Sequence, residues 1–230
     1  MNHNTKVYCK ALFDCITSPC EPNIHDIVYE TCGSMLIFEP EGLIAGVSES
    51  YIKHELDWYD SQDLNINGHN GIENNKVWLS CATNSGNVNS NYGWCIYSKE
   101  NCEQFNNAVI ALCADNSTKQ AIMCYTRPSI HKEWNDNVHA NHDMICTCYT
   151  SSLLRNGLLE HHVHMRSNDI WYGLRNDLAW QQEVLRRLVK ALNDNGVTCK
   201  AGNIKWFTDS LHLYERNIEL AKSYLTQYEF

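Results

Sequence analysis

The stretch "ICTCYTSSLLRNGLLEHHVHMR", residues 145–166, predicts two β-strands joined by a tight turn. Asn156-Gly157, at its middle, is a strong signal for a hairpin with a two-residue turn, because both residues tolerate positive φ. In the second strand, His162 and His164 would share one face, since successive side chains point to opposite faces. The hairpin places β-structure in the second half of the chain, and the flanking segments indicate what surrounds it.

Helix and strand patterns lie on both sides of this hairpin. After it, a helix with one apolar face is expected, ending before Gly196, because apolar residues recur at 178, 184, 185, 188, 189 and 192. Further along, 201–217 predicts a strand that leads into a final helix. Before the hairpin, 121–129 predicts a short strand closed by Pro128, and helices are expected over 48–61 and 99–117.

The remaining segments are irregular in pattern. Loops are expected over the Asn- and Gly-rich 64–76 and the polar 131–143, and the first 25 residues are an irregular lead-in or a first helix. No repeat, low-complexity segment or clear linker divides the chain. The prediction is one α+β domain over residues 1–230.

Composition excludes several classes of protein. The chain is 43% hydrophobic and 20% charged, as in soluble globular proteins, and no apolar run is long enough to suggest a membrane span. A formal net charge of −9 argues against nonspecific binding to nucleic acid or an anionic membrane, although a small anionic ligand needs only a few local cations. The N-terminus lacks the pattern of a signal peptide. We therefore expect a protein of the cytoplasm.

Twelve cysteines are many for this length, yet no two form a CxxC pair, so a zinc site is not expected. Without secretion most should be reduced, small and buried, and one of them could be a nucleophile. The clusters "HHVH" (161–164) and "HANH" (139–142) lack acidic or cysteine partners at ligand spacing. "HELDW" (54–58) lacks the second histidine of a zinc-protease helix. No metal site is predicted.

In "RSNDIWYGLRNDLAWQ" (166–181), Arg166, Asp169, Arg175 and Asp177 gather around Gly173, just before the predicted helix. The charges could simply be the solvated entrance to that helix, where an acidic side chain such as Asp177 is favoured by exposed N–H groups. They could also bind a ligand. The local pattern leaves both interpretations open.

Six blocks of sequence, in order, make the chain similar to the thymidylate synthase family, and most to its branch of deoxycytidylate hydroxymethylases. They cover roughly residues 28 to 220 and are "HELDWY" (54–59), "NSNYGW" (89–94), "IMCYTRPS" (122–129), "MICT" (144–147), "MRSND" with "GLRNDLAWQ" (165–181) and "SLHLYERN" (210–217). The resemblance implies an α+β fold with a large mixed sheet flanked by helices. It also implies a homodimer in which a face of the sheet is buried against the second subunit.

The family's chemistry assigns a role to several residues. Cys146 matches the nucleophile, which adds to C6 of a pyrimidine so that C5 can attack the one-carbon unit of 5,10-methylenetetrahydrofolate. A synthase then reduces that unit, whereas a hydroxymethylase adds water to it. Glu55 matches the glutamate that organises water and relays protons near the folate, and Tyr92 the tyrosine that helps to remove the C5 proton. Trp78 would supply an apolar wall against the folate.

The nucleotide would be held by a second set of residues. Arg166 and Ser167 match the phosphate-binding pair, and Arg166 would also depress the pKa of the Cys146 thiol. Asp169 matches a residue that shapes the pyrimidine and folate pocket. The pair that hydrogen-bonds the sugar hydroxyl corresponds to His212 and Tyr214.

Asp177 stands where synthases acting on uracil have an asparagine, whose amide donates to O4 and accepts from N3–H. Cytosine presents the opposite pattern, an acceptor at N3 and a donor at the 4-amino group. A carboxyl group can satisfy it, either protonated or as a carboxylate facing a ring protonated at N3, and a mismatch in a buried site is strongly rejected. Asp177 therefore points to a cytosine nucleotide, with dCMP and CMP both open.

The chain departs from the family at two places. The family's two phosphate-binding arginines, contributed across the dimer interface, are replaced by Lys119 and Gln120. Arg127 or Lys76 could compensate, or the phosphate could shift to suit a ribonucleotide. The C-terminal "AKSYLTQYEF" lacks the tail that closes over folate in synthases.

Two rival functions follow. The chain could be a thymidylate synthase or a uridylate hydroxymethylase, which Asp177 opposes. Alternatively, it could be a catalytically silent homologue that binds nucleotide.

Overall fold

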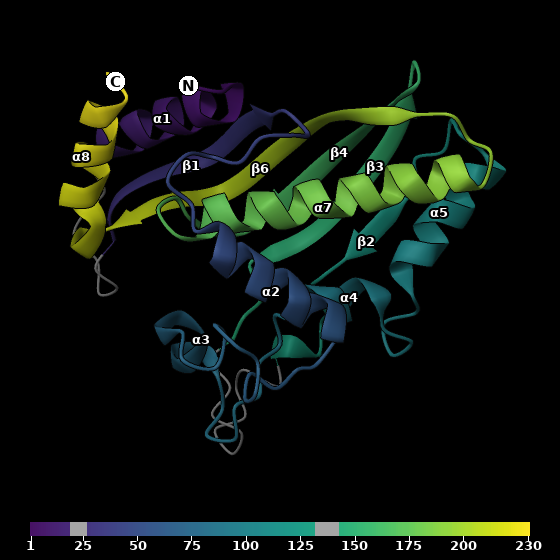
Figure 1. The fold of residues 1–230 in the computed structure, drawn as a ribbon, viewed down its shortest axis with the longest axis horizontal. Coiled ribbons are helices and arrows are strands. Elements are labelled where there is room, and N and C mark those ends of the chain that lie inside the picture. Colours follow the sequence, from purple (N-terminus) through teal and green to yellow (C-terminus); the bar gives the residue numbers. More distant parts are fainter. Residues whose placement is uncertain (19–26, 132–142) are drawn as a thin grey trace.

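A mixed β-sheet forms the centre of the computed structural model, which describes residues 1–18, 27–131 and 143–230 (Figure 1). The strand order is β1-β6-β4-β3-β2, with the short β5 pairing beside β6. β6 runs parallel to β4 and β5, and the other pairs are antiparallel. The strands are β1 (Ile27–Phe38), β2 (Ile122–Cys124), β3 (Thr147–Arg155), β4 (Leu158–Met165), β5 (Asn168–Asp169) and β6 (Lys200–Tyr214).

The hairpin expected at Asn156-Gly157 is present. β3 and β4 pair antiparallel up to Arg155 and Leu158, and the two residues between them have φ of 53° and 77°. Both lie in the left-handed region that a two-residue turn of type I′ requires, and this is where asparagine and glycine are tolerated. The sequence rule and the backbone geometry agree at this turn.

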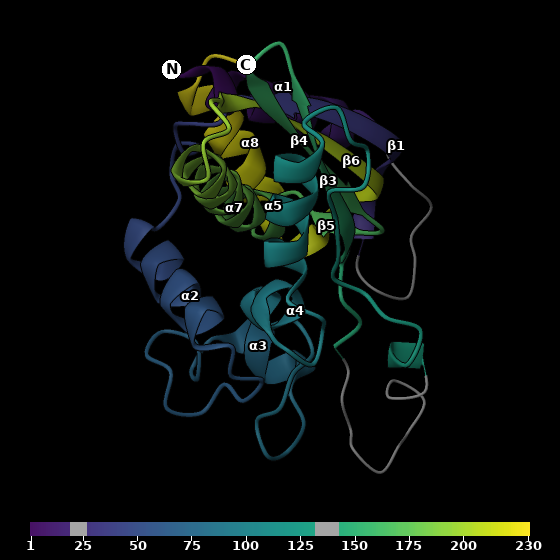
Figure 2. The same ribbon diagram turned by 90° about the vertical axis from the view of Figure 1, so that its right-hand side faces the viewer.

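One face of the sheet is covered by helices. Figure 1 shows α7 crossing in front of the strands, and Figure 2 shows α2 and α7 on the same side of them. The helices described are α1 (His3–Ile16), α2 (Glu49–Ser61), α3 (Lys76–Cys81), α4 (Tyr92–Tyr97), α5 (Gln104–Ala114), α7 (Gly173–Asp194) and α8 (Ile218–Gln227), with a 3₁₀ turn at Glu215–Asn217. The apolar stripe of α7 faces the sheet and is buried at Leu178, Val184, Leu185, Leu188 and Leu192.

Several predicted boundaries were wrong for identifiable reasons. α7 begins at Gly173 rather than near Leu178, because its first turn carries polar residues that face a cavity and so interrupt the apolar pattern. α5 begins at Gln104 rather than Lys99, since Cys102 and Glu103 have positive φ. Of the loop expected over 131–143 only the two end residues are described, and "HANH" lies outside the described residues. The helix offered as one reading of the N-terminus is confirmed as α1.

The opposite face of the sheet carries apolar and aromatic side chains, and none of the helices described above covers it. Tyr149 of β3 stacks on His164 of β4 at 4.2 Å between ring centroids, and His164 stacks on Phe207 of β6 at 4.6 Å. The register of the strands places His162 on this face with His164, as predicted. The exposed apolar members of the face include Met35, Ile37, Ile122 and Tyr149, at 58%, 39%, 44% and 37%.

The expectation for the cysteines was wrong in part. Those within the described residues are all free thiols, as expected. Cys9, Cys15, Cys95 and Cys199 are buried, whereas the others are half-buried or exposed. Residue type alone therefore misjudged their burial. Among the described helices, none is both long and apolar enough to cross a membrane.

Candidate functional site

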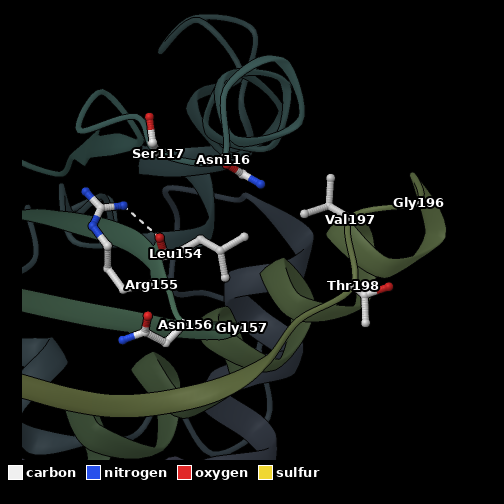
Figure 3. Close-up of a pocket in the computed structure, with 9 residues that line it drawn as sticks. All are labelled: Asn116, Ser117, Leu154, Arg155, Asn156, Gly157, Gly196, Val197 and Thr198. Carbon is white, nitrogen blue, oxygen red and sulfur yellow. Dashed lines mark hydrogen bonds between the residues drawn. The ribbon is translucent and has the colours of Figure 1, made fainter.

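A cavity of about 1180 Å³ opens between the helices and the carboxyl-terminal half of β6. Its wall comes from the loop before α2, from α2, α3 and α4, from the segment that precedes β3, from the loop around β5, from the first turns of α7, from the end of β6 and from α8. It collects most of the residues that the sequence singled out: Glu55, Trp78, Tyr92, Cys146, Ser167, Asp169, Asp177, His212 and Tyr214. A smaller hollow of about 390 Å³ beside the β3–β4 turn, drawn in Figure 3, contains none of them.

Cys146 lies at the entrance to β3, and Arg166 at the end of β4 reaches it. The Arg166 Nη2 atom is 3.6 Å from the Cys146 sulfur, and the Arg166 backbone N–H donates to the Cys146 carbonyl at 3.0 Å. The guanidinium also donates to the carbonyls of Met144 and Ile145, so it is held against the backbone rather than lining the cavity. The predicted pairing of thiol and guanidinium is confirmed.

Arg166 lowers the pKa of the Cys146 thiol as expected, but the net pKa is still raised. Burial raises the pKa of Cys146 to about 12, and the charges of Asp177 and Asp143 raise it further. Arg166 does lower this pKa, but burial outweighs it. The sulfur is therefore a thiol at neutral pH in this structure. A sequence shows which charges are near in the chain, whereas it does not show how deeply the sulfur is buried.

Asp177 lies on the cavity side of the first turns of α7, where Asn168 of β5 meets it. The side-chain amide of Asn168 donates to Asp177 Oδ2 at 2.8 Å. Burial raises the pKa of Asp177 to about 7, the charge of Asp169 adds to the rise, and the hydrogen bond from Asn168 opposes it. The Asp177 carboxyl can thus be neutral or charged near physiological pH. This excludes the interpretation of Asp177 as a solvated charge at the helix entrance.

Glu55 of α2 is 7% exposed and is reached by a chain of hydrogen bonds. The indole N–H of Trp78 donates to the Tyr51 hydroxyl at 2.9 Å, and that hydroxyl lies 2.9 Å from Glu55 Oε1. An indole N–H can only donate, so the single proton of Tyr51 goes to Glu55. Burial, with the charge of Asp177, raises the pKa of Glu55 to about 8. Neutral Glu55 therefore carries its proton on Oε2, because Oε1 accepts from Tyr51.

Tyr92 is the first residue of α4, and Gly93, the next residue, allows α4 to pack closely against α2. Gly93 has no room for a side chain, since a Cβ there would lie 1.8 Å from the carbonyl oxygen of Tyr59. The Tyr92 ring stacks on Tyr59 at 5.4 Å, and burial holds its pKa well above the usual range, so it is a neutral phenol. The backbones of α2 and α4 thus fix Glu55 and Tyr92 relative to each other.

His212 and Tyr214 close the cavity at the end of β6. The Nδ1 atom of His212 lies 3.3 Å from the Ser210 carbonyl, which can only accept, so Nδ1 carries the proton and Nε2 is the acceptor. Burial lowers the pKa of His212, which keeps the ring neutral. Its ring meets that of Tyr214 edge-on at 5.1 Å. In the parallel pairing of β5 and β6, Asp169 lies opposite His212.

Two predicted cations lie outside the cavity wall of the described chain. Lys119 is exposed on the segment before β2, as is Gln120. Arg127 donates to the Asn89 side chain at 3.0 Å and lies over the Trp94 ring at 5.3 Å. The alternative compensating cation, Lys76, does line the cavity. These placements leave the roles of Lys119 and Arg127 as predictions.

Three residues of the wall were missed by the sequence analysis. Tyr51 stands four residues before Glu55 on α2, a spacing that puts both on one helix face and could have revealed it. Arg216 lies over the Tyr214 ring at 4.2 Å and faces the cavity. Asn168 meets Asp177 only because β5 pairs with β6, and no local pattern announces that contact. Within 1–18, 27–131 and 143–230 no group of three metal-ligating side chains occurs.

Comparisons with known proteins agree with this geometry. A family model described as thymidylate synthase matches residues 46–230. The deoxycytidylate 5-hydroxymethyltransferases of Enterobacteria phages T4 and T2 are each 37% identical over 193 residues, which cover 83% of this chain and 77% of each phage protein. A thymidylate synthase of Buchnera aphidicola is 25% identical over 178 residues, 74% of this chain and 62% of that protein.

Proposed function

Because this chain belongs to the thymidylate synthase family, we propose that it is a cytidylate 5-hydroxymethyltransferase. It transfers the one-carbon unit of 5,10-methylenetetrahydrofolate to C5 of dCMP or CMP and hydrates it to a hydroxymethyl group. The whole chain, residues 1–230, acts as one domain of a homodimer. The observation that carries the proposal is Asp177, a carboxyl in the same cavity as the Cys146 sulfur.

The preference for cytosine is inferred from the pKa of Asp177. A carboxyl with a pKa near 7 can supply a proton to cytosine N3 and accept a hydrogen bond from the 4-amino group. Uracil offers a donor at N3 and an acceptor at O4, so an acid whose proton is on the oxygen that faces N3 would place donor against donor at N3 and acceptor against acceptor at O4. An unpaired polar contact in a buried site costs roughly 1–3 kcal/mol, enough for tenfold to hundredfold discrimination.

The reacting carbons would be handled by Cys146 and Tyr92. The Cys146 thiolate adds to C6 and moves the electron pair to C5, which bonds the one-carbon unit and then loses its proton near Tyr92. Because the thiol is protonated in this structure, its proton must leave before it adds. After tetrahydrofolate has left, water adds its hydroxide to the exocyclic carbon, and the C6–S bond breaks to restore both the ring and the thiolate.

Glu55 is suited to the hydration step. With a pKa of about 8 it can give up and take back a proton at neutral pH, and its Oε2 atom is the one not engaged by Tyr51. A base near this pH can take the proton of the attacking water while hydroxide adds to the exocyclic carbon. This supports Glu55 as the group that activates water.

The cavity fits two substrates. Its volume of about 1180 Å³ exceeds the roughly 300–1000 Å³ usual for a single small ligand. 5,10-Methylenetetrahydrofolate would supply a one-carbon unit at the oxidation level of formaldehyde. The apolar side chains Val77 and Trp78 of α3 and Leu220 of α8 offer it a wall, and Asp169 and Glu55 offer polar partners.

The second subunit would complete the phosphate site. Ser167 lines the cavity, Arg166 stands beside it, and Lys119 of a second copy would add a cation. The sheet face with the Tyr149, His164 and Phe207 stack supports a dimer, because exposed apolar side chains gather on it.

Mass spectrometry of the products tests the proposal. The purified protein is incubated with 5,10-methylenetetrahydrofolate and, separately, dCMP, CMP, dUMP and UMP. We expect a gain of one CH₂O on dCMP or CMP, and none with Cys146→Ala. Methylation of dUMP would contradict the reading of Asp177 and favour a synthase. Binding without any product would favour the silent homologue.

A further inference from the structure

We propose that Asn168 is a second reader of the cytosine base: its amide N–H fixes Asp177, and its carbonyl oxygen accepts a hydrogen of the 4-amino group. The inference rests on the proposed function, since it concerns how the same cavity selects cytosine. It adds a residue to the recognition that Asp177 was expected to perform alone.

Asn168 is placed by the sheet rather than by the helix that carries Asp177. It belongs to the two-residue strand β5, which pairs parallel with β6 opposite Leu211. Its side chain is 2% exposed and still borders the cavity. Strand pairing fixes its backbone, so its position does not depend on the flexibility of a loop.

The first half of the inference is the bond from Asn168 Nδ2 to Asp177 Oδ2, at 2.8 Å. An oxygen that accepts from an amide is best filled by the carbonyl oxygen of a neutral acid, so the proton of Asp177 is directed to Oδ1. That leaves Oδ1–H to donate to N3 and the second lone pair of Oδ2 to accept from the 4-amino group. Asn168 thus selects the tautomer of the acid that matches cytosine.

The second half of the inference concerns the carbonyl oxygen of the same Asn168 amide. Asn168 Oδ1 is buried, and among the described residues it has no hydrogen-bond partner. A buried carbonyl oxygen without a hydrogen-bond partner costs free energy. Asn168 Oδ1 also lies near Asp177, because it belongs to the same amide as Nδ2, which donates to Asp177 Oδ2. The 4-amino group has two hydrogens, of which Asp177 takes one. Asn168 Oδ1 is the nearby acceptor for the other.

Gly173 gives this arrangement its space. A Cβ at Gly173 would lie 3.0 Å from Asn168 Nδ2 and 3.5 Å from Asp177 Oδ2. The first distance is tighter than almost all Cβ contacts, so a side chain at Gly173 would push the Asn168 amide by a few tenths of an ångström, whereas glycine leaves it in place. Uracil would bring its O4 against Asn168 Oδ1, two acceptors facing each other, so the same oxygen that favours cytosine would also reject uracil.

Two variants test the proposal: Asn168→Ala, and Asn168→Leu, which has a similar volume but neither donor nor acceptor. Dissociation constants for the cytidine and uridine monophosphates of the same sugar are measured by calorimetry without folate, and kcat/KM for both by product formation. We expect both variants to reduce the preference for cytosine at least about tenfold, mainly through weaker binding of the cytosine nucleotide. Asn106→Ala, an exposed asparagine of α5, should keep the wild-type preference.

An equal loss for both nucleotides, or an unchanged preference, would overturn the proposal and leave Asn168 as support for the fold. If neither variant folds, the test uses the wild-type protein and N4-methyl-dCMP, which keeps one amine hydrogen. This nucleotide should bind at least about tenfold more weakly than dCMP. Equal binding would refute the contact between Asn168 Oδ1 and the 4-amino group. If the wild-type protein hydroxymethylates no nucleotide, the proposed function fails. The comparison of binding constants would still test Asn168.

Discussion

Asp177, which we propose binds the base, also acts on Cys146. Its negative charge raises the pKa of the Cys146 thiol, whereas a neutral Asp177 would not. If Asp177 is protonated when it reads N3, binding of cytosine removes that charge and favours the thiolate. Recognition of the base and activation of the nucleophile would then share one proton.

Replacing Asp177 by asparagine tests this coupling without a substrate. Asp177→Asn removes the charge at nearly constant shape, so the pKa of Cys146 should fall. The rate of Cys146 alkylation by iodoacetamide at pH 8, followed by peptide mass spectrometry, should rise roughly three- to tenfold. Asp57→Asn, on the exposed side of α2, should leave the rate unchanged. A slower or equal rate in Asp177→Asn would show that Asp177 does not control the thiol.

At the scale of residues, the sequence predicted the membership of the cavity better than its electrostatics. Resemblance placed Cys146, Asp177 and Glu55 together, and the structure brings them into one wall. It gave the effect of Arg166 on the pKa of Cys146 but not the larger effect of burial, which depends on the whole fold. It missed Asn168 because the partner that positions it is more than forty residues away in the chain, on β6.

At the scale of elements, a buried polar network ties α7 to the sheet. His161 of β4 is fully buried; its Nδ1 lies 2.9 Å from the Ser152 hydroxyl of β3 and its Nε2 2.9 Å from Gln181 Oε1 of α7. The Gln181 amide in turn donates to the Tyr125 hydroxyl at 3.4 Å. Three elements are therefore connected through one imidazole, which burial keeps neutral.

This imidazole makes stability depend on pH. Burial lowers the pKa of His161 from 6.5 to about 4, so between these values the unfolded chain binds a proton that the folded chain does not. The free energy of unfolding should therefore fall by about 3 kcal/mol from this group as the pH is lowered from 6.5 to 4. Above pH 6.5 the contribution of His161 should be constant.

Denaturant titrations at pH 4.5 and 7 measure the effect. Glu55 and Asp177 have raised pKa values and act in the opposite direction, so wild type is compared with His161→Gln. The variant should lose less stability on acidification than wild type, whereas His3→Gln, on the exposed part of α1, should match wild type. Identical acid sensitivity in wild type and His161→Gln would rule His161 out as the titrating group.

Elements with strong periodic signals were predicted and weak ones were not. The hairpin at Asn156-Gly157 and the apolar face of α7 follow from local rules, and both are present. The six-residue helices α3 and α4 are too short for an apolar period, although Asn75 and Asn91 cap them. β1 was not predicted, because "IVYETCGSMLIF" mixes glycine, serine and cysteine among its apolar residues and is defined by its pairing with β6.

At the scale of the whole molecule, the proposed dimer depends on the open face of the sheet. Phe207 of β6 stacks on the His164 ring and pairs with Met35 of the neighbouring strand β1. A charge introduced at Phe207 would therefore lie in the proposed interface. Phe207→Asp should shift the protein from dimer to monomer at micromolar concentration in sedimentation velocity, because an unpaired buried charge costs several kcal/mol. If the partner subunit completes the phosphate site, the activity of Phe207→Asp should fall as the dimer dissociates.

The control is Ile110→Asp, a more exposed apolar position on α5, away from the sheet face. It should remain dimeric and active. A Phe207→Asp protein that stays dimeric would locate the interface elsewhere, and a monomer with full activity would show that one chain holds the whole site.

The contact between Gly93 and the Tyr59 carbonyl has a consequence for mutational tolerance. A Cβ at Gly93 has nowhere to go except by pushing α4 away from α2, and with it Tyr92 away from Glu55. In a survey of all single substitutions scored by activity, Gly93 would rank with the nucleophile although it has no side chain to offer a substrate. Libraries meant to change the specificity of this cavity should therefore leave Gly93 fixed and vary the side chains around Asp177 instead.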